Sequence, residues 1–199
     1  KLRITTKAKS LSEAKLLIKP VKKELYDTFS TYIFGEDNEN LPTVLIKELI
    51  KRNESIVCAE SYTGGLLSSQ ITSVAGSSKV FKGSVIAYSN EIKNLILNVP
   101  KDLLNKYGAV SEEVAESMAT GVKNKFNSDW AISVSGIAGP SGASELKPIG
   151  LVFIAITGPN NETLKIKKQY NPLRNRNEIQ RLSVNDCLNS LRLILLSNK

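Results

Sequence analysis

Residues 60–93 read ESYTGGLLSSQITSVAGSSKVFKGSVIAYSNEIK, and this stretch organises the rest of the chain. It places hydroxyl groups, glycines, a tyrosine, an asparagine and a lysine between two short apolar runs, at residues 56–59 and 84–88. Polar residues gathered where rigid strands end are typical of the rim of an active site. The pattern therefore predicts two strands that bring functional side chains to one edge of a sheet.

The segment Ser61-Tyr62-Thr63-Gly64-Gly65 follows the first apolar run and opens a helical pattern. Backbone N–H groups that are free at the start of a helix can point at an anion. We therefore expect Thr63, Gly64 and Gly65 to contact a phosphate or a ribose, although glycines that only make a turn are an equal alternative.

The first part of the chain predicts a small β-α-β unit. Apolar residues alternate with polar ones over residues 2–8, which favours a half-buried strand. Ser10 and Glu13 form a capping-box pattern before a helix, and residues 31–34 resemble a second short strand. The polar stretch at residues 35–40 is typical of a domain boundary, so we assign residues 1–38 to this unit.

From residue 39 to residue 199 the pattern changes to alternating strands and helices. Apolar runs predict strands at 55–59, 130–134, 149–157 and 163–168, and the turn sequence at 158–161 makes the last two an antiparallel hairpin. Apolar residues at helical spacing predict a final helix over residues 176–197. The sequence predicts a three-layer α/β/α domain with a mixed sheet, preceded by the small β-α-β unit.

The composition is that of an ordinary globular protein, with 199 residues of which 41% are hydrophobic and 23% charged. No apolar run approaches the roughly 18–20 residues that a membrane span needs, and no leader pattern is present. We expect a cytoplasmic protein without a membrane contact. Because the sequence begins at Lys1, we also expect an upstream domain in the full-length chain.

The charge and the rare residues limit the chemistry. The net charge of +8 suits an anionic partner, but the lysines are dispersed among Asn and Glu, which favours a solvated surface over a nucleic-acid face. Cys58 and Cys187 lie far apart in apolar surroundings and are predicted to be buried free thiols. The absence of His removes Ser-His and Cys-His activation and most zinc sites, so hydrolysis would depend on Lys, Tyr or a carboxylate.

Several sequence blocks occur in a characteristic order between residues 41 and 196. They are Ala59-Glu60-Ser61-x-Thr63-Gly64-Gly65, Ala75-Gly76-Ser77-Ser78, Tyr88-Ser89-Asn90-Glu91-x-Lys93, Gly108-Ala109-Val110-Ser111, Ser135-Gly136-Ile137-Ala138-Gly139-Pro140 and Lys147-Pro148-Ile149-Gly150. Together they resemble the C-terminal domain of the competence/damage-inducible CinA proteins, which also occurs alone as the bacterial nicotinamide-nucleotide amidase (PncC). Tyr62 replaces the family's usual Cys, Ser141 stands where Asp is common, and Leu146 interrupts an acidic-Lys-Pro run.

The resemblance implies hydrolysis of nicotinamide mononucleotide to nicotinic acid mononucleotide and ammonia. It implies Ser78 as the nucleophile, Lys93 as the base that takes its proton, and Tyr88 as a helper hydroxyl. Taken alone, Ser78 would be a serine at a helix end and Lys93 a solvated lysine. No cofactor is implied, and we expect no metal, because His is absent and the carboxylates are scattered.

The resemblance also implies the residues that bind the substrate. Arg176 matches a phosphate-binding arginine in an imperfect segment, and Arg174 is the alternative. The loop that begins at Gly136 could offer backbone N–H groups to an oxyanion. The predicted binding set is Ser61, Thr63, Gly64, Gly65, Asn90, Gly136, Ala138, Gly139 and Arg176.

Two other classes of function remain open for the sequence alone. The basic charge and the competence association suggest a nucleic-acid-associated module, and the departures at Tyr62 and Ser141 suggest a non-catalytic scaffold domain. The first unit resembles the KH-like linker of CinA proteins, but Gly35 is its only glycine, so it lacks the GxxG loop that clamps nucleic acid. The partners we expect are a pyridine nucleotide and a second copy of the chain in a homodimer.

Overall fold

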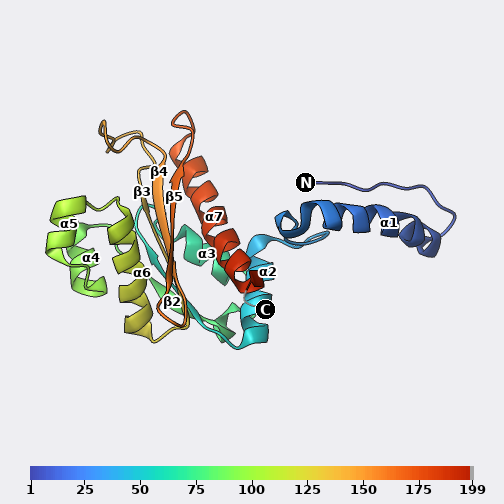
Figure 1. Ribbon diagram of the computed structural model, residues 1–199, viewed down its shortest axis with the longest axis horizontal. Coiled ribbons are helices and arrows are strands. Elements are labelled where there is room, and N and C mark those ends of the chain that lie inside the picture. The colour runs from blue at the N-terminus through green and yellow to red at the C-terminus, as the bar shows by residue number, and fades with distance from the viewer. Residues whose placement is uncertain (198–199) are drawn as a thin grey trace. The chain divides into compact units, whose positions relative to one another are not determined.

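The computed structural model describes residues 1–197 and divides the chain into two compact units, with the boundary after Asn40. The helices and strands, labelled in Figure 1, are α1 (Leu11–Phe29), η1 (Ser30–Tyr32), α2 (Leu41–Arg52), β1 (Ile56–Glu60), α3 (Leu66–Thr72), η2 (Ser77–Lys79), β2 (Phe81–Ile86), α4 (Asn90–Leu97), α5 (Lys101–Tyr107), α6 (Glu112–Phe126), β3 (Trp130–Gly136), β4 (Leu151–Thr157), β5 (Thr163–Gln169) and α7 (Arg176–Ser197).

The second unit is built on a five-stranded mixed sheet in the order β2-β1-β3-β4-β5. Strand β1 pairs in parallel with β2 and β3, and β3-β4 and β4-β5 are antiparallel, which confirms the predicted mixed sheet and hairpin. Glu60, the last residue of β1, lies opposite Ile86 of β2 and Val134 of β3. The carboxyl ends of these three strands therefore meet at one edge of the sheet.

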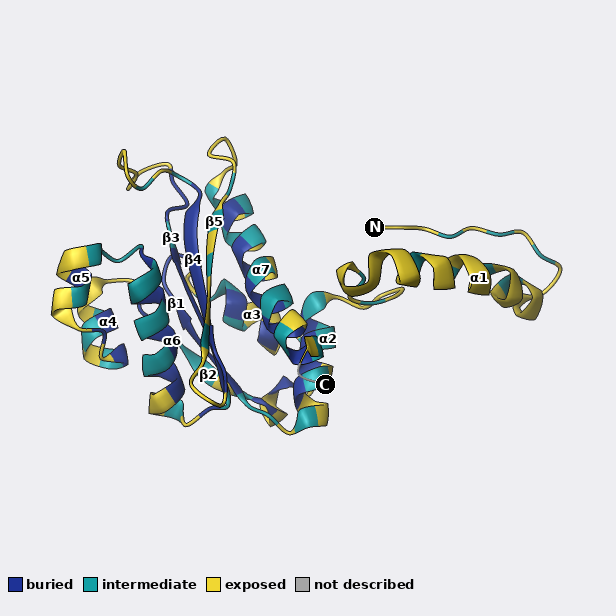
Figure 2. Ribbon diagram, in the orientation of Figure 1, coloured by how far each residue is buried: buried dark blue, intermediate teal, exposed yellow. Residues whose placement is uncertain are grey.

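Helices cover both faces of the sheet, α4, α5 and α6 on one side and α2, α3 and α7 on the other (Figure 1). Because side chains alternate along a strand, Ile56 and Cys58 of β1 join the core under α2, α3 and α7, while Val57 and Ala59 join the core under α4 and α6. All residues of β1 and β4 are buried, as Figure 2 shows for the centre of the sheet. The predicted three-layer α/β/α architecture is confirmed.

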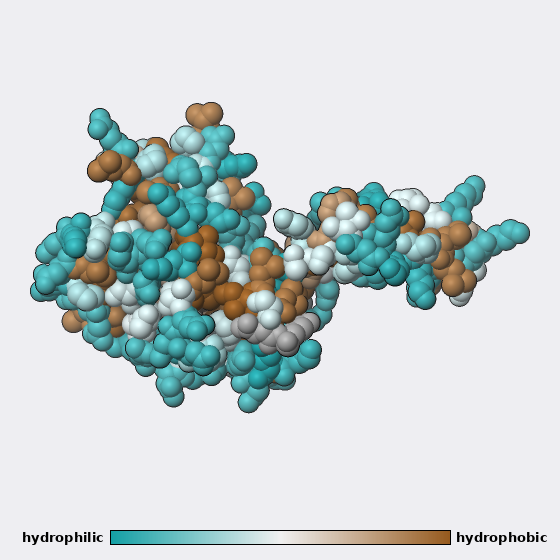
Figure 3. Space-filling model, in the orientation of Figure 1, coloured by the Kyte–Doolittle hydropathy of each residue, from teal (hydrophilic) through white to brown (hydrophobic). Residues whose placement is uncertain are grey.

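The first unit differs from the predicted β-α-β arrangement. The helix forms as expected, with Ser10 accepting a hydrogen bond from the Glu13 N–H, but residues 2–8 are irregular and residues 31–32 lie in η1. Strands need partners for their backbone groups, and a two-stranded pair without a packed face is marginal. Helix α1 offers no such face, because none of its residues is buried (Figure 2), and hydrophobic side chains remain at the surface of this unit (Figure 3).

Two simpler expectations concern the cysteines and the membrane. Cys58 and Cys187 are buried free thiols, as predicted. Within residues 1–197, every helix is too short or too polar to cross a bilayer.

The crossing of α4 and α6 generates a prediction about stability. A Cβ added to Gly121 of α6 would lie 2.0 Å from the carbonyl oxygen of Leu97, so the two helices would have to separate. We expect Gly121→Ala to lower the free energy of unfolding by about 1–3 kcal/mol, although alanine favours an isolated helix by about 1 kcal/mol. Urea unfolding measures the change. Thr120→Ala is the neighbouring control, and a Gly121→Ala protein as stable as the original would contradict the close crossing.

Candidate functional site

The chain leaves β1 through a buried carboxylate that holds the start of α3. Glu60 is fully buried, and its Oε2 accepts hydrogen bonds from the N–H groups of Gly65 (3.1 Å) and Leu67 (3.0 Å). Its Oε1 accepts from the N–H of Ser68 (2.9 Å) and from the Ser68 hydroxyl. Of these donors, only the Gly65 N–H belongs to the group, Thr63, Gly64 and Gly65, that we expected to contact a phosphate or a ribose. Glu60 supplies the anion instead, so a phosphate at this helix start is not supported.

Ser61 follows Glu60 and meets Lys93, which lies on the inner side of α4. Lys93 is fully buried, and its Nζ lies 3.1 Å from the Ser61 Oγ. The same Nζ lies 2.7 Å from the carbonyl oxygen of Ala87 and 3.2 Å from that of Tyr88. Both carbonyls belong to the segment that joins β2 to α4. The carboxyl ends of β1 and β2 therefore bring a serine and a buried lysine into contact.

The surroundings of Lys93 make its neutral form more accessible than that of a solvated lysine. Burial lowers the pKa of Lys93 from its usual 10.5 to about 8, because an ammonium group loses its hydration there. Within the described residues no carboxylate contacts Nζ, so nothing offsets this loss. A neutral amine has two N–H groups and one lone pair. As an ammonium, Lys93 donates to the Ser61 Oγ and to the two carbonyls; as a neutral amine it can keep both carbonyl contacts while its lone pair accepts the Ser61 proton.

Arg176 and Tyr88 lie together at the same edge. The Arg176 Nη1 donates to the carbonyl oxygen of Gly139 (3.1 Å), and its Nη2 lies 3.4 Å from the Tyr88 hydroxyl. Tyr88 is 63% exposed, so the pair is open to solvent. Arg174, the alternative, forms an exposed ion pair with Glu178 at 3.7 Å. The structure therefore places Arg176, and not Arg174, beside the other candidate site residues.

Ser78, the predicted nucleophile, lies elsewhere. It is an exposed residue of η2, which ends one residue before β2. The carbonyl of that intervening residue, Val80, accepts a hydrogen bond from the N–H of Ile56 at the start of β1. Lys93 contacts carbonyls that follow the end of β2. Six residues of strand, about 17 Å from first to last, separate these two ends. The structure thus separates Ser78 from Lys93 and brings Ser61 to Lys93 in its place.

The remaining predicted binding residues fall into two groups. Thr63 is buried and its Oγ1 has no partner among residues 1–197, while Gly64 and Gly65 have φ of +62° and +100°, which side chains disfavour. Gly136 ends β3, Ala138 and Gly139 lie in the loop that follows it, and Asn90 is exposed at the start of α4.

Sequence reasoning missed Glu60, Gln180 and Ser183. Glu60 belongs to one of the sequence blocks and lies shortly before the start of α3, whose N–H groups it binds. A carboxylate just before a helix could have indicated this role, because negative charge is favourable at a helix N-terminus. Gln180 and Ser183 lie on α7 and contact Tyr62. The sequence gives no local sign of these contacts, because they join residues more than a hundred positions apart.

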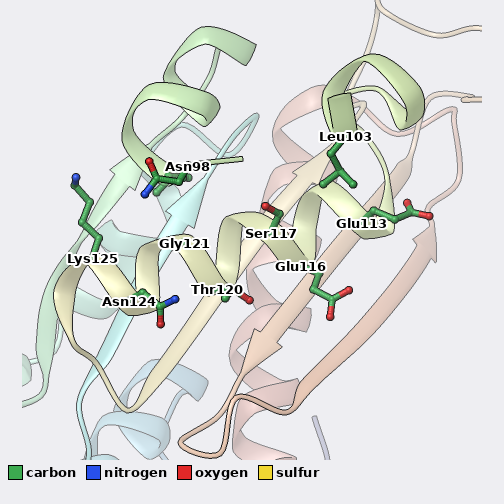
Figure 4. Close-up of a pocket in the computed structure, with 10 residues that line it drawn as sticks. Asn98, Leu103, Glu113, Glu116, Ser117, Thr120, Gly121, Asn124 and Lys125 are labelled. Atoms are coloured by element: carbon green, nitrogen blue, oxygen red, sulfur yellow. The ribbon is translucent and has the colours of Figure 1, made fainter. Parts of the chain in front are cut away.

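A hollow on the surface lies away from this site. It has a volume of about 680 Å³ and opens along α6 beside α4 and α5, as Figure 4 shows. Its serine and its lysine, Ser117 and Lys125, lie about two turns apart on α6, too far for a hydrogen bond. Within the described residues no cluster of His, Cys, Asp or Glu could hold a metal ion. We therefore take the Ser61–Lys93 contact, and not the hollow, as the candidate active site.

Comparisons with known proteins give a consistent assignment. Residues 38–195 match the family described as the CinA C-terminal domain. A CinA-like protein of Prochlorococcus marinus (strain MIT 9215) is 67% identical over 198 residues, and one of strain NATL1A is 48% identical over 199 residues. All of this chain is covered in both cases, but only 47% and 46% of the relatives, so the chain spans about half of their length.

Solved structures support the same family. The competence/damage inducible protein CihA from Agrobacterium tumefaciens aligns with a TM-score of 0.76 at 34% identity, covering 82% of this chain and 98% of that one. A CinA superfamily protein from Klebsiella pneumoniae aligns with a TM-score of 0.74 at 28% identity, covering 80% and 99%. The match over residues 38–195, together with these relatives, shows that the chain belongs to the CinA family and contains its C-terminal domain.

Proposed function

We propose that this chain is an amidohydrolase that removes the carboxamide nitrogen of nicotinamide mononucleotide, with Ser61 as nucleophile and Lys93 as base. The observation that carries the proposal is the 3.1 Å contact between Ser61 Oγ and a fully buried lysine whose pKa is lowered to about 8. A lysine becomes a base when burial disfavours its charge. Ser61 takes the role that the resemblance had suggested for Ser78.

The proposed chemistry needs only these two groups and water. The Ser61 Oγ forms a bond to the amide carbon while its proton passes to the Lys93 Nζ. The tetrahedral intermediate then expels the nitrogen, which takes that proton and leaves as ammonia, and an ester remains on Ser61. Water attacks the ester, Lys93 takes a proton from the water, and that proton returns to the Ser61 oxygen as the carboxylic acid is released.

Arg176 supports a phosphorylated substrate. Its guanidinium group lies at the rim of the site, beside an exposed tyrosine, and presents donors in a fixed fork that suits a phosphate. Among residues 1–197, the Arg176 guanidinium hydrogen-bonds to the Gly139 carbonyl oxygen and the Tyr88 hydroxyl, and to no carboxylate. A nucleotide whose phosphate meets Arg176 could place its base toward Ser61. The resemblance to nicotinamide-nucleotide amidases indicates that the base of this nucleotide is nicotinamide.

The first prediction separates the two serines. Ser61→Ala should lower kcat by at least about a hundredfold, because the nucleophile is lost, whereas Ser78→Ala should remain within about threefold of the original. Ammonia release from nicotinamide mononucleotide is the measurement. The reverse result, with activity lost in Ser78→Ala and kept in Ser61→Ala, would return the nucleophile to η2.

The second prediction concerns pH. Only neutral Lys93 can take the Ser61 proton, so kcat/KM should rise with pH and level off above a midpoint near the pKa of about 8. Lys93→Met should lose at least about a hundredfold in kcat at every pH, since the base is absent. Lys101→Arg, at an exposed position on α5, is the control. A flat profile between pH 6 and 9 in the original protein would rule out Lys93 as the base.

The third prediction concerns the phosphate. Arg176→Ala should raise KM with little change in kcat, because a group that does not react is bound equally in the ground and transition states. One lost charged hydrogen bond of about 2–3 kcal/mol corresponds to roughly 30–150-fold in kcat/KM. Arg174→Ala should remain within about twofold, because its partner is an exposed Glu178. Equal effects of the two variants would indicate a general charge effect instead of a phosphate contact.

A further inference from the structure

Three residues on one face of α7, about one helical turn apart, contact residues of the candidate site. Arg176, Gln180 and Ser183 are spaced four and three residues apart and so lie on one side of the helix. The Gln180 Nε2 donates to the carbonyl oxygen of Tyr62 at 2.7 Å, and the Tyr62 hydroxyl hydrogen-bonds to the Ser183 Oγ. The helix that carries the phosphate-binding candidate thus also holds the residue next to Ser61.

The structure fixes Tyr62 from both ends. Its side chain is buried, and the Ser183 hydroxyl that meets it donates in turn to the Ile179 carbonyl at 2.8 Å. A Cβ on Gly136 would lie 2.9 Å from the Tyr62 ring, so β3 leaves room for the phenol only because that residue is glycine. With the ring held, the Gln180 contact determines how the peptide between Tyr62 and Thr63 is turned.

The direction of that peptide matters for chemistry. The peptide is trans, so the Tyr62 carbonyl and the Thr63 N–H point in opposite directions. The carbonyl points at Gln180 on α7, which covers one face of the sheet, whereas Lys93 belongs to α4 on the other face. The Thr63 N–H therefore points away from Gln180 and α7, and Lys93 is not on α7. Among residues 1–197 the Thr63 N–H has no backbone or side-chain acceptor.

We propose that Gln180 is a positioning residue that aims the Thr63 N–H at the substrate's carbonyl oxygen as that oxygen becomes an oxyanion. This inference rests on the proposed function, because it assumes attack by Ser61. A donor that is already oriented where negative charge develops stabilises the transition state more than the ground state. Gln180 touches no reacting atom and acts only through the Tyr62–Thr63 peptide.

The test compares two replacements of Gln180 with a control on the same helix. Gln180→Met has a similar length but no donor, Gln180→Arg keeps a donor, and Asn185→Met changes an exposed residue of α7. We expect Gln180→Met to lose about 10–100-fold in kcat, somewhat less than removal of an oxyanion donor costs, with KM within about threefold. Gln180→Arg should recover most of kcat, and Asn185→Met should match the original. The pH midpoint of kcat/KM should stay the same in all, because the contacts of Lys93 are untouched.

A second measurement does not depend on turnover. The amide ¹H–¹⁵N resonance of Thr63 should move in Gln180→Met and return toward its original position in Gln180→Arg, because the peptide turns with its carbonyl partner. If the original protein releases no ammonia, the proposed function fails, and an unmoved Thr63 resonance would still overturn the positioning role by itself. If the original protein is active and Gln180→Met retains its kcat, or loses affinity instead, the positioning role is wrong while the amidase stands.

Discussion

The buried carboxylate of Glu60 is the interaction on which the site depends. A charge without solvent is costly unless its oxygens are hydrogen-bonded, and Glu60 meets this demand with three backbone N–H groups and one hydroxyl. Those N–H groups belong to the first turn of α3, whose dipole also favours negative charge. The chain must therefore turn tightly between β1 and α3, and the left-handed Gly64 and Gly65 allow it. Ser61 sits in that turn at a fixed place.

The hydrogen bonds between Glu60 and α3 also affect the pKa of Lys93. A carboxylate beside a buried lysine would stabilise its ammonium form and raise its pKa. Glu60 is next to Ser61 in sequence, but its oxygens accept hydrogen bonds from α3. Within residues 1–197 the Lys93 Nζ hydrogen-bonds only to a hydroxyl and two carbonyls. Desolvation then acts without opposition and brings the pKa to about 8. The chain contains no histidine, so a group that titrates near neutral pH must be of another residue type. Lys93 can be that group because the Glu60 carboxylate does not contact it.

Much of the fold could be predicted from the sequence, because periodicity and turn residues are local signals. The β4-β5 hairpin and α7 are examples. The structure of the first unit could not be predicted in the same way. Whether its two expected short strands form depends on partners that the local pattern does not reveal. The separation of Ser78 from Lys93 could have been predicted on physical grounds. Residues that follow parallel strands share the carboxyl edge, as Ser61, Tyr88 and Lys93 do, whereas Ser78 precedes β2 and must lie at the amino edge.

The tyrosine at position 62, where the sequence resemblance implies a cysteine, indicates what this turn can tolerate. A phenol is much larger than a thiol and carries a hydroxyl that must find a partner when buried. Gly136 on β3 provides the space, and Ser183 on α7 provides the partner, so the larger side chain turns into the core and away from Lys93. Burial raises the pKa of the Tyr62 phenol, which keeps it neutral and unsuited to act as a base. Position 62 therefore serves to hold the turn, and in the proposed mechanism the chemistry is left to the hydroxyl before it and the peptide after it.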